Sequence, residues 1–148
     1  MTQDLDIGLL ERGVLSGAEY LISRLDSKEV ATSWRKHDFS LVTELDIAAG
    51  KVITEVLNDG RPIICEEDPA SHSFFNQQDS TWLVDPLDGT TACKRFASDR
   101  NGNIGFGPLV SLVEQGQIQA CSFYHISRRS FYTAVRGKGA WWIESDLS

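Results

Sequence analysis

The sequence predicts an α+β fold in which two N-terminal helices pack on a mainly antiparallel sheet. Two segments near the N-terminus, about 4–26 and 43–57, carry apolar residues at steps of three and four, the spacing of an amphipathic helix. Short apolar runs separated by turns follow from residue 62 onward and indicate strands. The chain has 148 residues, which is enough for one domain with its own core.

The first helix is expected to bury one apolar stripe, formed by Ile7, Leu10, Val14, Ala18, Leu21 and Leu25. Three glycines, Gly8, Gly13 and Gly17, lower the intrinsic helix propensity of this segment. We therefore expect the helix to depend on tertiary packing. The segment that follows, 27–39, is expected to be a polar connector.

The second helix is expected to begin just after Thr43. Thr43 and Asp46 have the spacing of a capping box, with Asp in the position usually held by Glu. Its apolar stripe would comprise Ile47, Ala48, Val52, Ile53, Val56 and Leu57. A short strand is expected at 62–65, followed directly by Glu66, Glu67 and Asp68 and then by a polar loop over 69–80. Three acids after a strand are often only a solvated loop, and His72 is expected to be a surface histidine.

The most informative stretch is an apolar run at 81–84 that ends in two acids, Asp85 and Asp88. The run reads as a buried strand, which Pro86 and Gly89 are expected to stop. Both acids are thereby displayed at a strand end, where binding groups are commonly found. Pro86 also restricts Asp85 to an extended conformation, so the first acid is held stiffly.

The residues after the second acid favour a bound anion. Gly89 allows the backbone to approach a ligand closely, and Thr90 and Thr91 can open a short helix whose free N–H groups suit a phosphate. Two carboxylates next to an anion site would repel the anion unless divalent cations bridge them. The alternative interpretation is a polar turn in which Asp85 caps the helix.

A Gly- and Asn-rich loop is expected over 97–108, at the surface and able to line a substrate entrance. A meander of strands should follow, at 109–113, 118–126 and 131–135, closed by a glycine-rich turn and a final strand over 136–141.

Net charge and composition exclude some classes of protein. A net charge of −7 disfavours a nucleic-acid binder, and no apolar run is long enough to span a bilayer. The N-terminus lacks the features of a signal peptide. The three cysteines, Cys65, Cys93 and Cys121, form no zinc-ligand pairs, and their odd number predicts reduced thiols in a cytoplasmic protein.

The stretch from Asp85 to Thr90 reads Asp-Pro-Leu-Asp-Gly-Thr, and here the chain resembles the inositol monophosphatase-like, metal-dependent phosphatases. Their signature is an apolar strand followed by Asp-Pro-(Leu/Ile)-Asp-Gly-(Thr/Ser). The segment from Asp38 to Asp46 follows a second family pattern, Asp-x-x-Val-Thr-x-x-Asp. Haloacid-dehalogenase phosphatases have one residue between their acids, whereas Pro86 and Leu87 separate the two acids here.

The resemblance implies a layered α/β sugar-phosphatase fold and a Mg²⁺-dependent phosphomonoesterase that uses a metal-activated water. It implies two or three Mg²⁺ ions, with Mn²⁺ as a substitute and Li⁺ as an inhibitor. The implied metal ligands are Glu66, Asp85, the Leu87 carbonyl and Asp88, with Glu67 as a looser candidate. Asp46 and Thr90 would together activate the water, and the backbone N–H groups of Gly89, Thr90 and Thr91 would hold the phosphate.

Residues 1–148 correspond to the N-terminal, metal-binding half of a family member, and the C-terminal half is absent from the sequence. That half supplies another metal-binding aspartate after a tryptophan, and no Trp-Asp pair occurs here. The chain is thus expected to be a fragment, a truncated product or one part of a two-chain protein. A homodimer is expected, through the surface that would otherwise meet the second half.

Two functions remain open at this point. The first is an enzyme that acts on a small phosphate ester, with inositol monophosphate, 3′-phosphoadenosine 5′-phosphate and fructose 1,6-bisphosphate as candidate substrates. The second is a non-catalytic module or partner subunit that keeps the fold and binds metal or phosphate weakly. Ala92 and Cys93, where the family commonly has Asn-Phe or Glu-Phe, favour the second.

Overall fold

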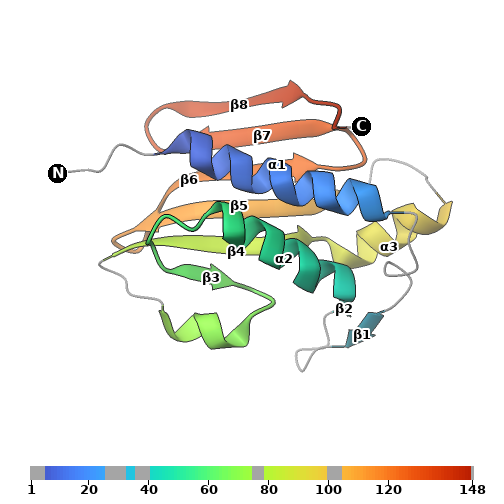
Figure 1. The fold of residues 1–148 in the computed structure, drawn as a ribbon. Helices are drawn as coiled ribbons and strands as arrows, with labels where there is room; N and C mark the ends of the chain where they lie inside the picture. Colours follow the sequence, from blue (N-terminus) through green and yellow to red (C-terminus); the bar gives the residue numbers. More distant parts are fainter. Residues whose placement is uncertain (1–5, 26–32, 36–40, 75–78, 100–104, 148) are drawn as a thin grey trace.

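Helices α1 (Ile7–Arg24) and α2 (Glu44–Val56) lie across one face of a six-stranded sheet (Figure 1). The structure is a computed structural model that describes residues 6–25, 33–35, 41–74, 79–99 and 105–147. A third helix, α3 (Thr90–Asp99), follows the end of strand β4. This arrangement confirms the predicted α+β fold with two N-terminal helices on a sheet.

The sheet has the strand order β3-β4-β5-β6-β7-β8. Its strands are β3 (Ile63–Cys65), β4 (Ser80–Asp88), β5 (Gly107–Glu114), β6 (Gln117–His125), β7 (Ser130–Val135) and β8 (Gly139–Glu144). Only β3 and β4 pair in parallel, and the other neighbours are antiparallel. The predicted meander is therefore confirmed, and the single parallel pair contains both acidic strand ends.

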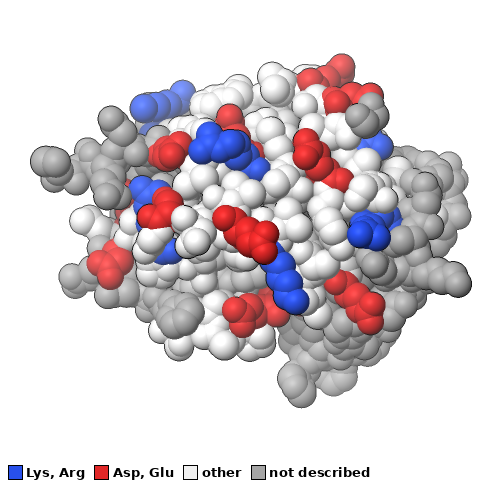
Figure 2. All heavy atoms as spheres, in the orientation of Figure 1, with Lys and Arg blue, Asp and Glu red and all other residues white. Residues whose placement is uncertain are grey.

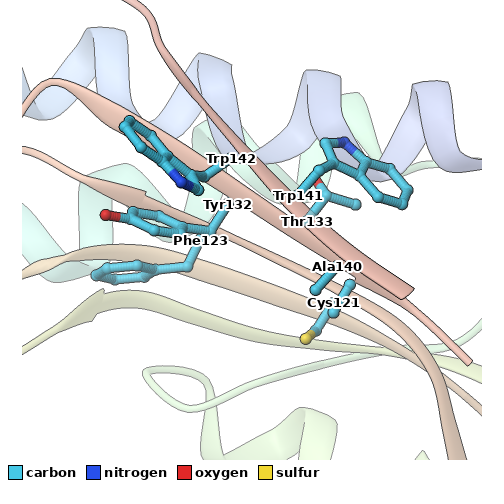
Figure 3. A pocket seen from close by; sticks show the side chains of 8 residues that line it. Cys121, Phe123, Tyr132, Thr133, Ala140, Trp141 and Trp142 are labelled. Carbon is cyan, nitrogen blue, oxygen red and sulfur yellow. The ribbon is translucent and has the colours of Figure 1, made fainter.

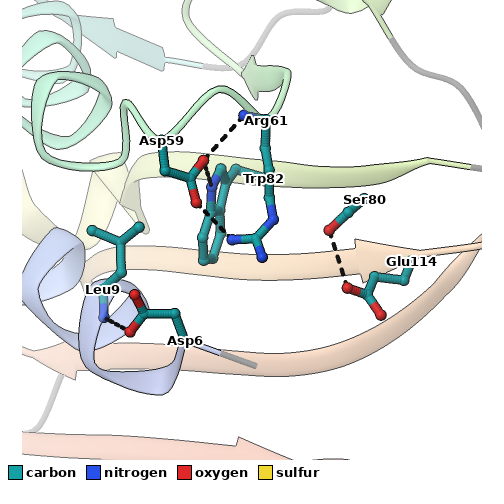
Figure 4. A network of polar contacts seen from close by, with 7 residues as sticks. All are labelled: Asp6, Leu9, Asp59, Arg61, Ser80, Trp82 and Glu114. Carbon is teal, nitrogen blue, oxygen red and sulfur yellow. Dashed lines mark hydrogen bonds and ion pairs between the residues drawn. The ribbon is translucent and has the colours of Figure 1, made fainter. Parts of the chain in front are cut away.

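Two of the glycines in α1 are explained by its contact with α2. A Cβ atom on Gly13 would lie 2.9 Å from Leu57 Cδ2, and one on Gly17 would lie 2.7 Å from Ile53 Cδ1. Both partners are fully buried. The glycines lower helix propensity but allow the two helices to approach closely, so tertiary packing holds α1 as expected. Asp6 caps the helix by accepting a hydrogen bond of 2.9 Å from the Leu9 N–H (Figure 4).

Trp82 anchors the start of β4 in the core, where its side chain is fully buried. Its indole N–H donates to Asp59 Oδ1 at 3.2 Å, and the Arg61 guanidinium lies over its ring at 5.3 Å (Figure 4). Arg61 in turn pairs with Asp59 at 2.6 Å. The turn before β3 is therefore tied to β4, which fixes the pairing of these two strands.

Several local predictions were wrong. Pro86 does not stop β4, which continues to Asp88 through a β-bulge. The polar connector contains a strand, β1 (Ser33–Arg35), paired antiparallel with β2 (Leu41–Thr43). The loop after β3 begins with a 3₁₀ helix, η2 (Pro69–Phe74).

The expected surface loop at 97–108 is shorter than predicted. Its first residues, up to Asp99, belong to helix α3, and its last residues, from Gly107, belong to β5. Phe106 is fully buried, with its ring 5.3 Å from that of Phe96. The middle of the segment, 100–104, lies outside the described residues. Among the described helices, none is long and apolar enough to cross a membrane.

Gly107 offers a direct test of the fold. A Cβ atom there would lie 1.7 Å from the Tyr124 carbonyl oxygen, which belongs to a neighbouring strand and cannot move aside. We expect Gly107→Ala to lower the free energy of unfolding by about 3 kcal/mol or more. The control is Gly116→Ala, where φ is also positive (+74°) but no atom lies within 4 Å, so the cost should be about 1 kcal/mol. Urea unfolding of both variants measures the difference, and equal costs would contradict this packing.

Candidate active site

The parallel pairing of β3 with β4 brings the first two predicted acids together. Cys65 is in register with Val84, so Glu66, the first residue after β3, lies beside Asp85, the next residue of β4. The Glu66 N–H donates to the Val84 carbonyl at 3.0 Å and extends the ladder by one bond. The carboxyl ends of parallel strands meet at one edge of a sheet, and this is the physical basis of the convergence.

The end of β3 is held by Ser71, a residue that sequence reasoning missed. Its buried hydroxyl accepts a hydrogen bond of 3.0 Å from the Cys65 N–H and donates one of 2.6 Å to the Asp68 carbonyl. His72 Nε2 lies 3.0 Å from the Cys65 carbonyl, and His72 is exposed as expected. A serine in a polar loop carries no sequence signal for this role, because the role depends on η2 folding back onto β3.

A β-bulge separates the two acids of β4. Asp85 is in register with Leu109, whereas Asp88 is in register with Gly107, so the β4 segment is longer than its partner by one residue. Pro86, which has no N–H to donate, lies within this bulge, where a proline is tolerated. Asp85 is half-buried and Asp88 exposed.

Gly89 turns the chain from β4 into α3. Its φ is +83°, and a Cβ atom there would lie 2.6 Å from the Gly105 carbonyl oxygen, so only glycine fits. The Gly89 carbonyl accepts the first helical hydrogen bond, 2.9 Å from the Cys93 N–H. The leading N–H groups of α3, at Thr90 and Thr91, have no partner within the helix and suit an anion.

Asp46 reaches the same place from the first turn of α2. Its carboxylate, 1% exposed, accepts a hydrogen bond of 3.2 Å from Thr90 Oγ1. The Thr90 hydroxyl also lies 3.2 Å from the Leu87 carbonyl, a second acceptor for its single proton. Gly50, one turn along α2, lets the helix approach Pro86, because a Cβ atom there would lie 3.1 Å from the proline ring. The structure therefore brings Asp46 and Thr90 together, 44 residues apart in sequence.

The electrostatics of the group are unfavourable for an ionised Asp85. Burial, a hydrogen bond with Glu66 and the negative charges of Glu66, Asp88 and Asp46 together raise the pKa of Asp85 to about 8, with burial as the largest cause. One proton is thus held among these acids at neutral pH. Glu66, Asp88 and Asp46 therefore all lie close enough to Asp85 to act on it.

These residues fit a hard divalent cation. The donors are oxygens only, and Asp85 Oδ1 is buried with no hydrogen bond from any described residue. Within the described residues, no group of three His, Cys, Asp or Glu side chains is arranged to hold a metal ion. Because Asp85 holds a proton with a pKa of about 8, a cation would have to displace that proton to bind its carboxylate.

The nearby thiols do not compete for such a cation. Burial raises the pKa of Cys65 to about 11 and that of Cys93 to about 12, so both are neutral. The described chain contains no disulfide involving either one or Cys121.

Glu67 lies apart from this group. Its side chain lines a separate hollow of about 250 Å³ against α2, together with residues such as Lys51 and Asp68. It is not among the charges that raise the pKa of Asp85. The structure thus places Glu66, the predicted ligand, beside Asp85, and Glu67, the looser candidate, in a different hollow.

Comparison with known proteins identifies the family. Residues 12–147 match the inositol monophosphatase family. The 3′(2′),5′-bisphosphate nucleotidase CysQ of Salmonella typhimurium is 41% identical over 110 residues, which are 72% of this chain. The chain belongs to the inositol monophosphatase family, as its acidic motif predicted.

More distant relatives match a larger share of the chain. The Nus factor SuhB of Escherichia coli is 26% identical over 138 residues, which are 90% of this chain and 48% of SuhB. The crystal structure of CysQ from Bacteroides thetaiotaomicron superposes with a TM-score of 0.72 at 25% identity, covering 95% of this chain and 49% of that one. The chain spans about half the length of the relatives it matches, and 42% of the Salmonella CysQ.

The raised pKa of Asp85 predicts how stability depends on pH without metal. Asp85 holds its proton more tightly in the folded chain, with a pKa of about 8, than at its ordinary value of 3.8. The free energy of unfolding should therefore be highest in acid and fall as pH rises between these two values. Asp85→Asn should flatten that fall. Urea unfolding with a chelator present measures both, and an equal fall in the two proteins would contradict the proton sharing.

Proposed function

We propose that the chain is the N-terminal, metal-binding half of a Mg²⁺-dependent phosphomonoesterase that cleaves a small phosphate ester. The observation that carries the proposal is the convergence of Glu66, Asp85, Asp88 and Asp46 at the N-terminus of α3, with the resulting rise in the pKa of Asp85. Divalent cations between these carboxylates and a phosphate at the N-terminus of α3 would offset the repulsion among the negative charges. Family membership and the 41% identity to CysQ support the same conclusion.

In this proposal Glu66, Asp85, Asp88 and the Leu87 carbonyl hold the cations. Bound magnesium supplies Lewis-acid polarisation of the phosphate and lowers the pKa of the attacking water. Thr90 and Asp46 would orient that water: Thr90 donates its hydroxyl proton to Asp46, so its oxygen is free to accept a hydrogen bond from the water. As the water loses a proton to the Thr90 oxygen, the Thr90 proton would pass to the Asp46 carboxylate. The N–H groups of Gly89, Thr90 and Thr91 hold the phosphate oxygens.

For the substrate, we propose a nucleotide that carries a phosphate at the 3′ or 2′ position and another at the 5′ position. The support is the name of the Salmonella relative, a 3′(2′),5′-bisphosphate nucleotidase, at 41% identity. Inositol monophosphate and fructose 1,6-bisphosphate are the other substrates to assay. Phosphate release from 3′-phosphoadenosine 5′-phosphate, compared with these two, measures the preference.

A second candidate function is a non-catalytic module that keeps the fold and binds metal or phosphate. It is favoured by Ala92 and Cys93, which stand where the family commonly has Asn-Phe or Glu-Phe. Calorimetric titration with Mg²⁺ or Mn²⁺, with and without phosphate, separates the two functions when it is combined with a turnover assay. Cation binding with turnover supports the enzyme, and cation binding without turnover supports the module.

Asp88 tests the metal site. Asp88→Asn should weaken Mg²⁺ binding by at least about tenfold, since it removes a ligand charge. The free energy of unfolding should change by no more than about 0.5 kcal/mol, because the side chain is exposed. Glu55→Gln, an acid-to-amide change on the exposed side of α2, is the matched control and should leave Mg²⁺ binding intact. Equal Mg²⁺ affinities for Asp88→Asn and the wild type would exclude Asp88 as a ligand.

Thr90 tests the catalytic pair separately from the metal. Thr90→Val keeps the shape of the side chain but removes the hydroxyl that donates to Asp46, so turnover should fall about 100-fold or more. Thr90→Ser restores the hydroxyl and should retain most of the turnover. Mg²⁺ affinity should be similar in both variants. If Thr90→Val and Thr90→Ser turned over equally fast, the hydroxyl would have no role in the reaction.

A further inference from the structure

The position of Glu66 depends mainly on its own backbone, because its side chain is exposed and the core does not pack around it. Glu66 and Glu67 are the central residues of a turn, which the Asp68 N–H closes by donating to the Cys65 carbonyl at 3.0 Å. On the side of β4, the Glu66 N–H donates to the Val84 carbonyl at 3.0 Å. The direction of the Glu66 carboxylate therefore depends on how the two ends of this turn are held.

A single buried hydroxyl bonds both ends of the turn. β3 is an edge strand, so the outer side of its backbone needs hydrogen-bond partners that do not come from another strand. At Cys65 these partners come from η2. The Ser71 hydroxyl accepts a hydrogen bond of 3.0 Å from the Cys65 N–H and donates one of 2.6 Å to the Asp68 carbonyl. The Cys65 carbonyl can only accept, so His72 Nε2 donates to it at 3.0 Å.

The turn needs this support because charge repulsion acts against it. Glu66 lies beside Asp85, and its negative charge is one of the causes that raise the pKa of that acid. Ser71 is only 3% exposed, so water cannot take the place of its hydroxyl without a movement of η2. Loss of the hydroxyl would leave the Cys65 N–H without its partner and would free the turn to move away from Asp85.

We propose that Ser71 and His72 are positioning residues for Glu66, and that their hydrogen bonds to the Cys65 backbone set the cation affinity of the site. The inference rests on the proposed function, because it takes Glu66 as a cation ligand. Neither residue would touch the cation. They hold the turn with the Glu66 carboxylate beside Asp85, so that a cation does not have to order the turn when it binds. Groups that hold a metal ligand in this way commonly contribute about 10–100-fold to metal affinity.

Magnesium affinity can report on this turn because the surfaces in Figures 2 and 3 are poor cation sites. On the face covered by α1 and α2, Lys and Arg side chains lie among the Asp and Glu side chains (Figure 2). A hollow of about 210 Å³ beside β8 contains no carboxylate (Figure 3). It is lined by the aromatic row of Phe123, Tyr132 and Trp142 and by small side chains such as Cys121 and Ala140. Hard cations prefer carboxylate oxygens, which these residues do not offer.

Calorimetric titration of the 148-residue chain with Mg²⁺ tests Ser71. Ser71→Ala should weaken Mg²⁺ binding about tenfold, because the turn that carries Glu66 loses the group that bonds both of its ends. Ser73→Ala is the matched control. It is the same change on the same 3₁₀ helix, but the Ser73 hydroxyl is exposed and bonds the Ala70 carbonyl at 3.1 Å, so Mg²⁺ affinity should not change. Each titration is made at a temperature at which circular dichroism shows the variant to be folded.

His72 provides a second variant that does not disturb the core, because its side chain is exposed. His72→Ala removes the bond to the Cys65 carbonyl and should weaken Mg²⁺ binding about threefold. His72→Gln keeps a side-chain N–H of similar reach and should restore most of that affinity.

A double variant shows whether Ser71 acts through Glu66. Glu66→Gln should weaken Mg²⁺ binding, and Ser71→Ala added to it should weaken binding no further. The positioning role is overturned if Ser71→Ala binds Mg²⁺ as tightly as the wild type, if Ser73→Ala loses as much affinity, or if the losses from Glu66→Gln and Ser71→Ala add. Mg²⁺ binding that is absent from the wild type, or unchanged by Glu66→Gln, would instead overturn the proposed cation site and this inference with it.

Discussion

The pairing of β3 with β4 is the constraint on which the candidate site depends. Cys65 and Val84 are in parallel register, and this alone brings Glu66 next to Asp85. The repulsion between these neighbouring carboxylates opposes folding when both are ionised. Protonation of Asp85 relieves it, as the raised pKa of Asp85 indicates. The same repulsion makes the site receptive to cations, which can replace that proton without rearranging the strands.

The pairing is secured from both sides by residues with no part in the chemistry. Ser71 holds the backbone at the end of β3, and the contact of Asp59 and Arg61 with Trp82 holds the beginning of β4. On the helical face, Gly50 lets α2 lie against the bulge in β4. The acids therefore lie on a rigid frame of strands and helices, which suits a site whose geometry must resist its own charge repulsion.

The sequence predicted correctly the elements that are fixed by residues close together in the chain. It failed for elements whose structure depends on a contact with a distant segment. Helix α1 and the strands of the meander were predicted from apolar periodicity, because the residues on their buried faces recur at a fixed spacing in the sequence. Pro86 was predicted to end β4, but a bulge removes the need for its missing N–H, and only the partner strand reveals a bulge. Phe106 was assigned to a surface loop because the segment around it is rich in glycine and asparagine. The prediction failed because Phe106 is buried against Phe96, ten residues away in the sequence.

The sequence by itself determined the family and the candidate acids, because Asp85, Asp88 and Gly89 are close neighbours at the end of one apolar run and form a recognisable motif without the fold. Glu66 was preferred to Glu67 by resemblance alone, and its position next to Asp85 depends on the parallel register of two strands, which the sequence does not show. The resemblance already paired Asp46 with Thr90 and preferred Glu66 to Glu67, and the tertiary structure supplies the contacts: a hydrogen bond of 3.2 Å from Thr90 to Asp46, and a different hollow for Glu67. The physical reason is that these contacts join segments far apart in the sequence, so they depend on which strands pair and in what register.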